Sequence, residues 1–276
     1  MKLIACQYDI AWEDKPANHQ RLSAWLRERR PEPGTLVLLP EMFATGFSMN
    51  VAKIAEGNGA AEGADRPSER WLAELAAELG VYLLAGVVNV GPDGRGRNQA
   101  VVFDPQGAQL ARYAKLHPFS HAGEDDHFAG GDRLALFDWQ GLKVAPVVCY
   151  DLRFPELFRH LTRAGAELFA VIANWPAARA HHWRPLLQAR AIENQAFVVG
   201  LNRCGQDPNV PYSGQSVAYD PQGRAVAEAG EQPAMLDCDI DREVLTTFRA
   251  KFPALRDMRA DLLGPRWPRV DGADRD

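Results

Sequence analysis

Three apolar stretches of the sequence each end abruptly at a side chain that can take part in chemistry. Glu41 follows TLVLLP, Cys149 ends VAPVVC, and Asn174 follows LFAVIA. In parallel α/β sheets, ligands bind beyond the carboxyl ends of the strands. We therefore expect these three side chains to share one pocket.

Cys149 is the candidate nucleophile of this pocket. The sequence YDLRFPE follows it, and Pro155 suits the first turn of a helix, so Cys149 should lie in a tight strand-to-helix turn. Backbone N–H groups in such a turn can hold an oxyanion, and the positive end of the helix favours a thiolate. The alternative is a small buried residue, the usual role of cysteine. Cys6, Cys204 and Cys238 lie within or at the ends of predicted strands and fit that alternative.

Two carboxylates and one lysine complete the candidate chemistry. Burial after an apolar run should raise the pKa of Glu41 and suit it to be a general base near neutral pH. The alternative is a loop carboxylate that caps the backbone of Thr45 or Gly46. Lys115 follows the strand-like LARYA and can supply a fixed positive charge near a carbonyl, although a lone lysine is more often solvated. Glu124 lies in the loop that follows Lys115.

The same loop is rich in histidine. His117, His121 and His127 lie within KLHPFSHAGEDDHF, and zinc is one interpretation of such a cluster. No spacing there matches a standard zinc signature, and no second ligand pair is clear, so we expect no metal. The chain also lacks a GxSxG nucleophile elbow, a GxGxxG fingerprint and a Walker motif.

The elements that must position these residues alternate apolar strands with stretches of helical period, an order typical of α/β proteins. Strands are predicted over 2–8, 35–40, 81–90, 98–104, 142–150, 167–174, 196–202, 213–220 and 234–240. Helices are predicted over 16–30, 67–79, 155–164, 182–194 and 241–250.

An internal repeat relates the two parts of the chain. The turn DPQG at 104–107 recurs at 220–223, and the strand at 78–86 lies over 194–202 at the same offset. CQYD (6–9) likewise corresponds to VCYD (148–151). Chance is the alternative, because DPxG is a common hairpin turn. Three elements in register favour two similar halves, each a sheet with helices on one face. Packed sheet to sheet, they predict a four-layer αββα sandwich.

Composition restricts the class of protein and its partners. The 276 residues are 46% hydrophobic and 24% charged with a net charge of −5, as in soluble globular proteins. Basic residues are scattered among acidic ones, so we expect no nucleic acid partner, and no apolar run is long enough to span a membrane. The N-terminus does not resemble a secretory signal, and the four cysteines are widely spaced. These features favour the reduced cytoplasm.

The C-terminal segment differs from the rest in composition. Residues 251–276 are rich in proline and charge, so we expect a single domain over 1–250 followed by an arm or a partly disordered tail. Trp267 lies between two prolines, which suggests that part of the tail docks on another surface.

Three separated motifs resemble those of the nitrilase superfamily of carbon–nitrogen hydrolases. LLPEMFATGF (38–47), YAKLHPF (113–119) and VVCYDLRFPE (147–156) are similar to its glutamate, lysine and cysteine motifs, in the same order. ANWP (173–176) and the segment 181–203 also match, so the resemblance covers about residues 2–240. The fold of that superfamily is the αββα sandwich.

The resemblance assigns a role to each motif residue. It implies that Glu41 is the general base, Lys115 the oxyanion-stabilising lysine and Cys149 the nucleophile. Glu124 resembles the second glutamate of the family, which positions the lysine and the substrate. The backbone N–H of Tyr150 would be the other oxyanion donor.

The resemblance also suggests residues for the walls of the pocket. Related carbamoyl-amino-acid hydrolases use an arginine at the position of Arg153 for a substrate carboxylate, and the alternative is a structural ion pair with Glu156 or another acid. Phe43, Asn174 and Trp175 are candidates for the pocket wall.

Among the branches of the superfamily, the chain is most similar to omega-amidases. It is thus expected to hydrolyse the terminal amide of a small omega-amido acid such as 2-oxoglutaramate or succinamate, without cofactor or metal, and to form a homodimer. Alternatives are a nitrile, an N-carbamoyl amino acid or deaminated glutathione as substrate, a silent partner-binding protein, and a thiol sensor based on Cys149.

Overall fold

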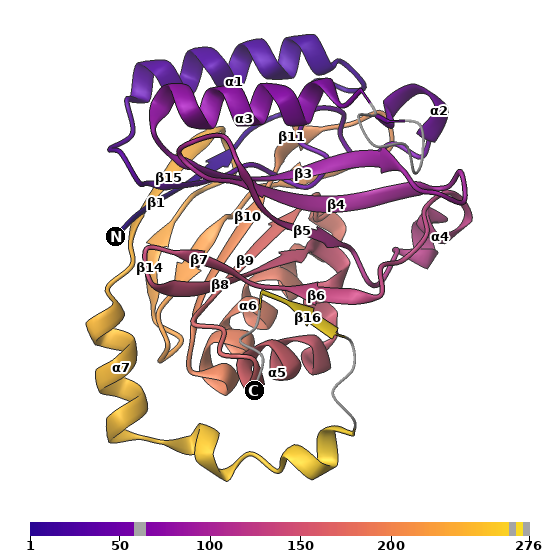
Figure 1. Ribbon diagram of the computed structural model, residues 1–276. Coiled ribbons are helices and arrows are strands. Elements are labelled where there is room, and N and C mark those ends of the chain that lie inside the picture. The colour runs from indigo at the N-terminus through magenta and orange to yellow at the C-terminus, as the bar shows by residue number, and fades with distance from the viewer. Residues whose placement is uncertain (58–64, 265–268, 273–276) are drawn as a thin grey trace.

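The computed structural model describes residues 1–57, 65–264 and 269–272. Two six-stranded sheets pack face to face, with α1 and α3 over the outer face of one and α5 and α6 over the outer face of the other (Figure 1). The helices are α1 (Lys15–Arg29), α3 (Pro67–Leu79), α5 (Pro155–Arg163) and α6 (Ala180–Asn194). This arrangement is the predicted αββα sandwich.

Each sheet is mixed, with three parallel strands at its centre. The first has the order β15 (Ala234–Asp239), β1 (Lys2–Gln7), β2 (Leu36–Leu38), β3 (Tyr82–Val90), β4 (Gly96–Phe103) and β5 (Gln109–Ala114). The second has the order β7 (Phe137–Trp139), β8 (Leu142–Val148), β9 (Leu168–Ala173), β10 (Phe197–Asn202), β13 (Val217–Tyr219) and β14 (Ala225–Glu228). Read in these directions, β1, β2 and β3 correspond to β8, β9 and β10.

The predicted repeat is therefore present in three dimensions. In both halves an antiparallel hairpin closed by DPQG follows the third parallel strand. The two turns have the same hydrogen bonds: Gly107 N donates to Asp104 O, and Gly223 N donates to Asp220 O, each over 2.9 Å.

The main hydrophobic core fills the space between the two sheets and continues between the second sheet and its helices α5 and α6. Leu84 of β3 and Ile172 of β9 belong to it and are fully buried. A second core lies between the first sheet and its helices, and includes Leu83, Leu26 of α1 and Leu72 of α3. Because successive residues of a strand point to opposite faces, Leu83 and Leu84 enter different cores. Strands buried on both faces account for the continuous Val, Ile and Leu runs of the sequence.

Several predicted boundaries are wrong at strand ends. β2 is shorter than 35–40, since Pro40 has no N–H with which to continue the ladder. The strand predicted over 213–220 is only β13, because Gly214 and Gln215 have positive φ values. A short hairpin, β11 (Cys204–Gln206) with β12 (Pro211–Ser213), precedes it and was not predicted.

The C-terminal segment runs along the outside of the sandwich. After α7 (Arg242–Lys251), two short 3₁₀ helices cover Ala254–Asp257 and Ala260–Leu263, and β16 (Arg269–Asp271) pairs in parallel with β6 (Arg133–Ala135). Trp267 lies outside the described residues. No helix in the described part of the chain is both long and apolar enough to cross a membrane.

Candidate active site

The turn after β8 holds Cys149 in a constrained backbone conformation. Cys149 begins a 3₁₀ helix, Cys149–Arg153, and has φ 46°, in the left-handed region that few residues other than glycine adopt. Pro155 then starts α5, in the first-turn position expected from the sequence. Such a turn presents the side chain at the carboxyl edge of the sheet, with the first N–H groups of the 3₁₀ helix beside it.

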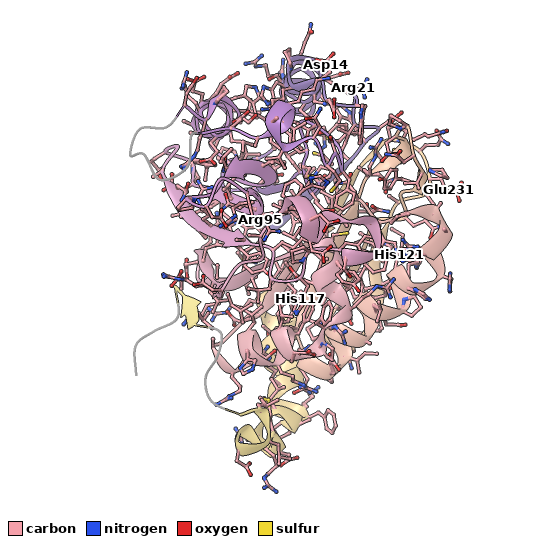
Figure 2. The ribbon with its side chains drawn as sticks, turned by 90° about the vertical axis from the view of Figure 1, so that its right-hand side faces the viewer. Asp14, Arg21, Arg95, His117, His121 and Glu231 are labelled. Carbon is pink, nitrogen blue, oxygen red and sulfur yellow. The ribbon has the colours of Figure 1, made fainter. Side chains whose placement is uncertain are left out.

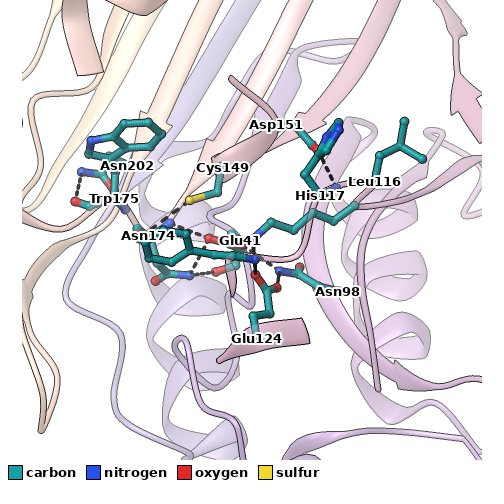
Figure 3. A network of polar contacts seen from close by, with 12 residues as sticks. Glu41, Asn98, Leu116, His117, Glu124, Cys149, Asp151, Asn174, Trp175 and Asn202 are labelled. Atoms are coloured by element: carbon teal, nitrogen blue, oxygen red, sulfur yellow. Dashed lines mark hydrogen bonds and ion pairs between the residues drawn. The ribbon is translucent and has the colours of Figure 1, made fainter. Parts of the chain in front are cut away.

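Glu41 and Lys115 form a fully buried ion pair next to this turn. Lys115 Nζ lies 2.9 Å from Glu41 Oε1 and 2.8 Å from Glu124 Oε2. Asn98 Nδ2 also bridges the two carboxylates, over 2.7 Å to Glu41 and 2.8 Å to Glu124 (Figure 3). One cation and one amide thus hold two carboxylates in a fixed arrangement away from water.

Asn174 connects this charged cluster to the second sheet. Its backbone N–H donates to Glu41 Oε2 over 2.8 Å, and its side-chain Nδ2 donates to the carbonyl oxygen of Glu41 over 2.7 Å. The Cys149 sulfur lies 3.9 Å from the carbonyl oxygen of Asn174 (Figure 3). The three strand-end residues of the sequence analysis therefore meet in one place. The alternative role for Glu41 is wrong, because the N–H groups of Thr45 and Gly46 both donate to Met42 O.

A buried aspartate ties the two reactive loops together. Asp151, two residues after Cys149, accepts hydrogen bonds from the Tyr113 hydroxyl over 2.6 Å and from the His117 backbone N–H over 3.0 Å. Tyr113 and His117 flank Lys115 by two residues on either side. The carboxylate of Asp151 therefore fixes the lysine loop relative to the cysteine turn.

The protonation states differ from those expected. Burial alone would raise the pKa of Glu41, but the charge of Lys115 and the hydrogen bonds that the carboxylate accepts lower it below its usual value. The predicted upward shift is thus wrong in sign. Burial raises the pKa of Cys149 well above its ordinary value, and the charge of Glu41 raises it further, although Lys115 opposes both. The helix end does not produce a resting thiolate.

The surroundings of Lys115 favour its protonated, positively charged form. Burial would lower its pKa, but the carboxylates of Glu124 and Glu41 raise it above the usual value. The resting site is consequently a thiol beside a carboxylate and an ammonium. A carboxylate in contact with a neutral thiol can remove its proton as the sulfur attacks.

A cavity of about 330 Å³ opens beside the sulfur. Trp175, Phe47, Phe119 and Tyr212 supply aromatic walls, and Arg153 supplies positive charge. This combination of apolar walls and a few polar groups is typical of a small-molecule site.

Phe43 was expected in this wall, and the structure places it elsewhere. Its ring is fully buried in the core beneath α1 and α3, 5.5 Å from the ring of Trp71 and 5.6 Å from that of His19. Phe47, four residues later, lines the cavity in its place. The loop after β2 places Phe43 in the core under the helices and Phe47 in the cavity wall. Closeness to Glu41 in the sequence therefore does not predict which phenylalanine faces the site.

Arg153 lines the cavity without an acidic partner among the described residues. Its guanidinium lies 4.7 Å from the centre of the Trp175 ring, and one of its nitrogens lies 3.1 Å from His182 Nδ1. The structural ion pair with Glu156 is thus absent. Among the described residues, no three His, Cys, Asp or Glu side chains are grouped so that they could hold a metal ion.

Several residues of the site were not predicted from the sequence, among them Asn98 and Arg179. Asn98 begins a predicted strand whose centre, AVVF, is apolar, and a polar side chain at the end of such a strand is the signal that could have marked it. Arg179 lines the cavity from the loop after Trp175, and no feature of the sequence distinguishes it from other surface arginines.

Comparisons with known proteins agree with this geometry. The carbon-nitrogen hydrolase family model matches residues 2–250. The chain is 40% identical to omega-amidase YafV of Yersinia enterocolitica, over 95% of this chain and 98% of that protein. It is 33% identical to the 2-oxoglutaramate amidase of Bacillus subtilis, over 94% and 98% of the two chains.

A solved structure shares the fold closely. A CN-hydrolase superfamily protein from Xanthomonas campestris, whose structure holds an arsenic adduct in the active site, is 34% identical with a TM-score of 0.87, over 94% of this chain and 97% of that one. Fold, buried Glu–Lys pair and sequence similarity over nearly the full length agree, and the chain belongs to the carbon–nitrogen hydrolase family.

Proposed function

We propose that the chain is an amidase that works through a thioester on Cys149, with Glu41 as base. The observation that carries this proposal is the buried contact of Glu41 with Lys115 beside a constrained cysteine at the wall of a cavity. The lowered pKa of Glu41 supports a carboxylate that is ionised and ready to accept a proton at neutral pH.

The cycle is an acyl transfer in two stages. As Cys149 Sγ attacks the amide carbon, its proton passes to Glu41, and the carbonyl oxygen becomes an oxyanion. The carbon–nitrogen bond then breaks, and the proton on Glu41 moves to the leaving group, which departs as ammonia. A water molecule next gives a proton to Glu41 and attacks the thioester carbon. The carbon–sulfur bond breaks, and the proton returns to sulfur as the acid leaves.

The oxyanion needs donors that are already in place. Lys115 Nζ and the backbone N–H of Tyr150 are proposed for this role, because one lies in the buried cluster and the other follows the nucleophile in its turn. Glu124 is proposed to hold Lys115 in position through the 2.8 Å contact between them.

The proposed substrate is a small omega-amido acid, such as 2-oxoglutaramate or succinamate. The relatives named omega-amidase and 2-oxoglutaramate amidase support this class. Arg153 supports it too, because it lines the cavity with no acidic partner among the described residues and so suits a substrate carboxylate. Asn174 and Trp175 are proposed to shape the acyl site next to the sulfur.

The first test is ammonia release from both amides. Wild type is expected to release ammonia, and Cys149→Ala to fold and release essentially none, because no other group can form the thioester. Cys238→Ala, which alters a buried cysteine outside the cavity, should keep its activity.

Three other results would each contradict a different part of the proposal. A folded, fully active Cys149→Ala would sink the proposed mechanism. Activity on a nitrile, an N-carbamoyl amino acid or deaminated glutathione, and none on the two amides, would move the protein to another branch. Reversible oxidation of Cys149 with no amide turnover would indicate a thiol sensor.

We further propose a cytoplasmic homodimer whose catalytic domain is residues 1–250. The four cysteines all lie buried and unpaired, which supports a reducing compartment, and the family model ends at residue 250. The dimer is expected from the family resemblance. A monomer in a solution mass measurement at micromolar concentration would count against it.

A further inference from the structure

Two arginines face the cavity, and neither is neutralised by an acid in the part of the chain that the structure describes. Arg153 ends the 3₁₀ helix that starts at Cys149, and Arg179 ends a short 3₁₀ helix, Ala177–Arg179, that follows Trp175. The two buried arginines among the described residues each pair with an acid, Arg190 with Glu193 over 2.9 Å and Arg203 with Asp9 over 2.6 Å. The cavity, by contrast, is lined by two partly buried guanidiniums that have no acidic partner in the described part of the chain.

Aromatic rings hold both guanidiniums in place. Arg179 lies 5.0 Å from the centre of the Phe119 ring, and Arg153 lies over Trp175. The indole nitrogen of Trp175 donates to the backbone oxygen of Arg179 over 2.8 Å, which ties the two arginine-bearing loops to one side chain. Stacking on a ring restrains a guanidinium without using its N–H donors. Among the described residues, the one hydrogen-bond partner of these two guanidiniums is His182, 3.1 Å from one Arg153 nitrogen, so the other donors can meet a ligand.

The acid in the cavity wall is already occupied. Asp207 Oδ1 accepts the backbone N–H groups of Asn209 and Val210, and its Oδ2 accepts the Tyr212 hydroxyl over 2.6 Å. Asp207 is the only acidic residue among those described at the cavity. The charge of the two arginines is consequently left for a bound molecule.

We propose that Arg179 is a specificity-determining residue that joins Arg153 in binding the carboxylate of the substrate, at a distance from the reacting amide. This rests on the proposed amidase function and deepens it. Two guanidinium forks around one carboxylate favour amides that carry an anionic group at the far end and disfavour neutral amides of the same length.

The test compares two amides of equal chain length that differ in charge. Succinamate carries a terminal carboxylate, and butyramide carries a methyl group there. Wild type should prefer succinamate. Arg179→Gln should lower kcat/KM for succinamate on the order of 10–100-fold, mainly through KM, and change the value for butyramide less than about threefold. The kcat/KM of Arg179→Lys for succinamate should lie between the values of wild type and Arg179→Gln.

Arg184→Gln is the matched control. Arg184 lies on α6 in a surface ion pair with Glu228 and does not line the cavity, so both amides should react as in wild type. If Arg179 served only to hold the Phe119 loop, Arg179→Gln would lower both rates together. That outcome, or no change in either rate, would overturn the proposal.

A binding measurement keeps the proposal separate from the proposed function. In Cys149→Ala, succinate should bind by calorimetry, and adding Arg179→Gln should weaken it on the order of 10-fold or more. Unchanged succinate binding in the double variant would overturn the inference, whether or not the wild type hydrolyses the amides. A wild type that hydrolyses neither amide would by itself refute only the proposed amidase function. Equal wild-type rates on both amides would refute the anion subsite and leave the amidase standing.

Discussion

The two halves of the molecule share one topology but contribute different chemistry to the site. The first half supplies a buried ionic cluster, in which Glu41, Lys115 and Glu124 are almost completely shielded from solvent. The second half supplies Cys149 and most of the cavity wall, to which Phe47 and Phe119 of the first half also contribute. The charges of the Glu–Lys cluster are thus kept where water cannot screen them, whereas Cys149 and the two arginines line the cavity.

Equivalent positions show how far the halves have diverged. In the alignment of CQYD with VCYD, Gln7 occupies the place of Cys149, and its amide binds Ser216 and two backbone carbonyls in a purely structural role. At the offset of the DPQG turns, Lys115 corresponds to Glu231, which lies exposed at the edge of the molecule (Figure 2). A repeated scaffold therefore does not imply a repeated site.

The largest effect is expected when the cation of the first half is removed. Lys115→Met leaves two buried carboxylates without a counter-charge and removes the proposed oxyanion donor. We expect kcat to fall on the order of 10²–10³ or more, and the free energy of unfolding to drop by about 3–5 kcal/mol. Steady-state kinetics and urea denaturation measure the two effects.

A second variant separates charge balance from catalysis. Lys115→Met with Glu124→Gln removes one of the two carboxylate charges, so part of the stability should return while the activity stays low. Lys53→Met, at an exposed lysine, should behave as wild type. Near-normal activity in the double variant would show that Lys115 is only structural.

A smaller effect is expected at a pair of glycines in corresponding strands. A Cβ on Gly86 of β3 would lie 2.4 Å from Glu41 Cα and 2.6 Å from Met42 N. A Cβ on Gly200 of β10 would meet only side chains, the end of Leu187 at 2.3 Å and the Trp183 ring at 2.9 Å. Backbone atoms cannot yield as a side-chain end can. Gly86→Ala should therefore displace Glu41, the proposed base, and lower kcat/KM by about 10–100-fold.

Gly200→Ala should instead cost about 1–3 kcal/mol of stability and keep kcat/KM within about twofold. Gly230→Ala, where nothing lies within 4 Å of the added Cβ, is the control for both. Equal losses of activity at Gly86 and Gly200 would contradict the assignment of the base to the first half.

The smallest effect is expected where the halves are most alike. Asp104 Oδ1 accepts the N–H groups of Gln106 and Ala108, and Asp220 makes the same pair of bonds in the second turn. Replacing either aspartate by alanine should cost about 1–2 kcal/mol in urea denaturation and leave the activity unchanged. A loss of turnover in either variant would tie that turn to the site.

Sequence reasoning found most of the fold because the repeat leaves local signals. The DPQG turns, the apolar runs and the proline and glycine at the ends of the helix at 67–79 depend on short-range chemistry. The same reasoning missed the β11–β12 hairpin. Its pairing depends on the chain reversal at 207–210, and neither of its strands has an apolar run to mark it.

The sequence by itself determined the sandwich, the motif residues Glu41, Lys115 and Cys149, and their meeting at the ends of strands. Only the tertiary structure decided the electrostatics. The pKa of Glu41 is lowered because Lys115, 74 residues away, and Asn174, 133 residues away, converge on its carboxylate. Burial of the segment around Glu41, considered alone, predicts a raised pKa for its carboxyl group. Which side chains face the cavity, including Arg179 and the choice of Phe47 over Phe43, was likewise decided by how the two halves pack, since local periodicity carries no information across that interface.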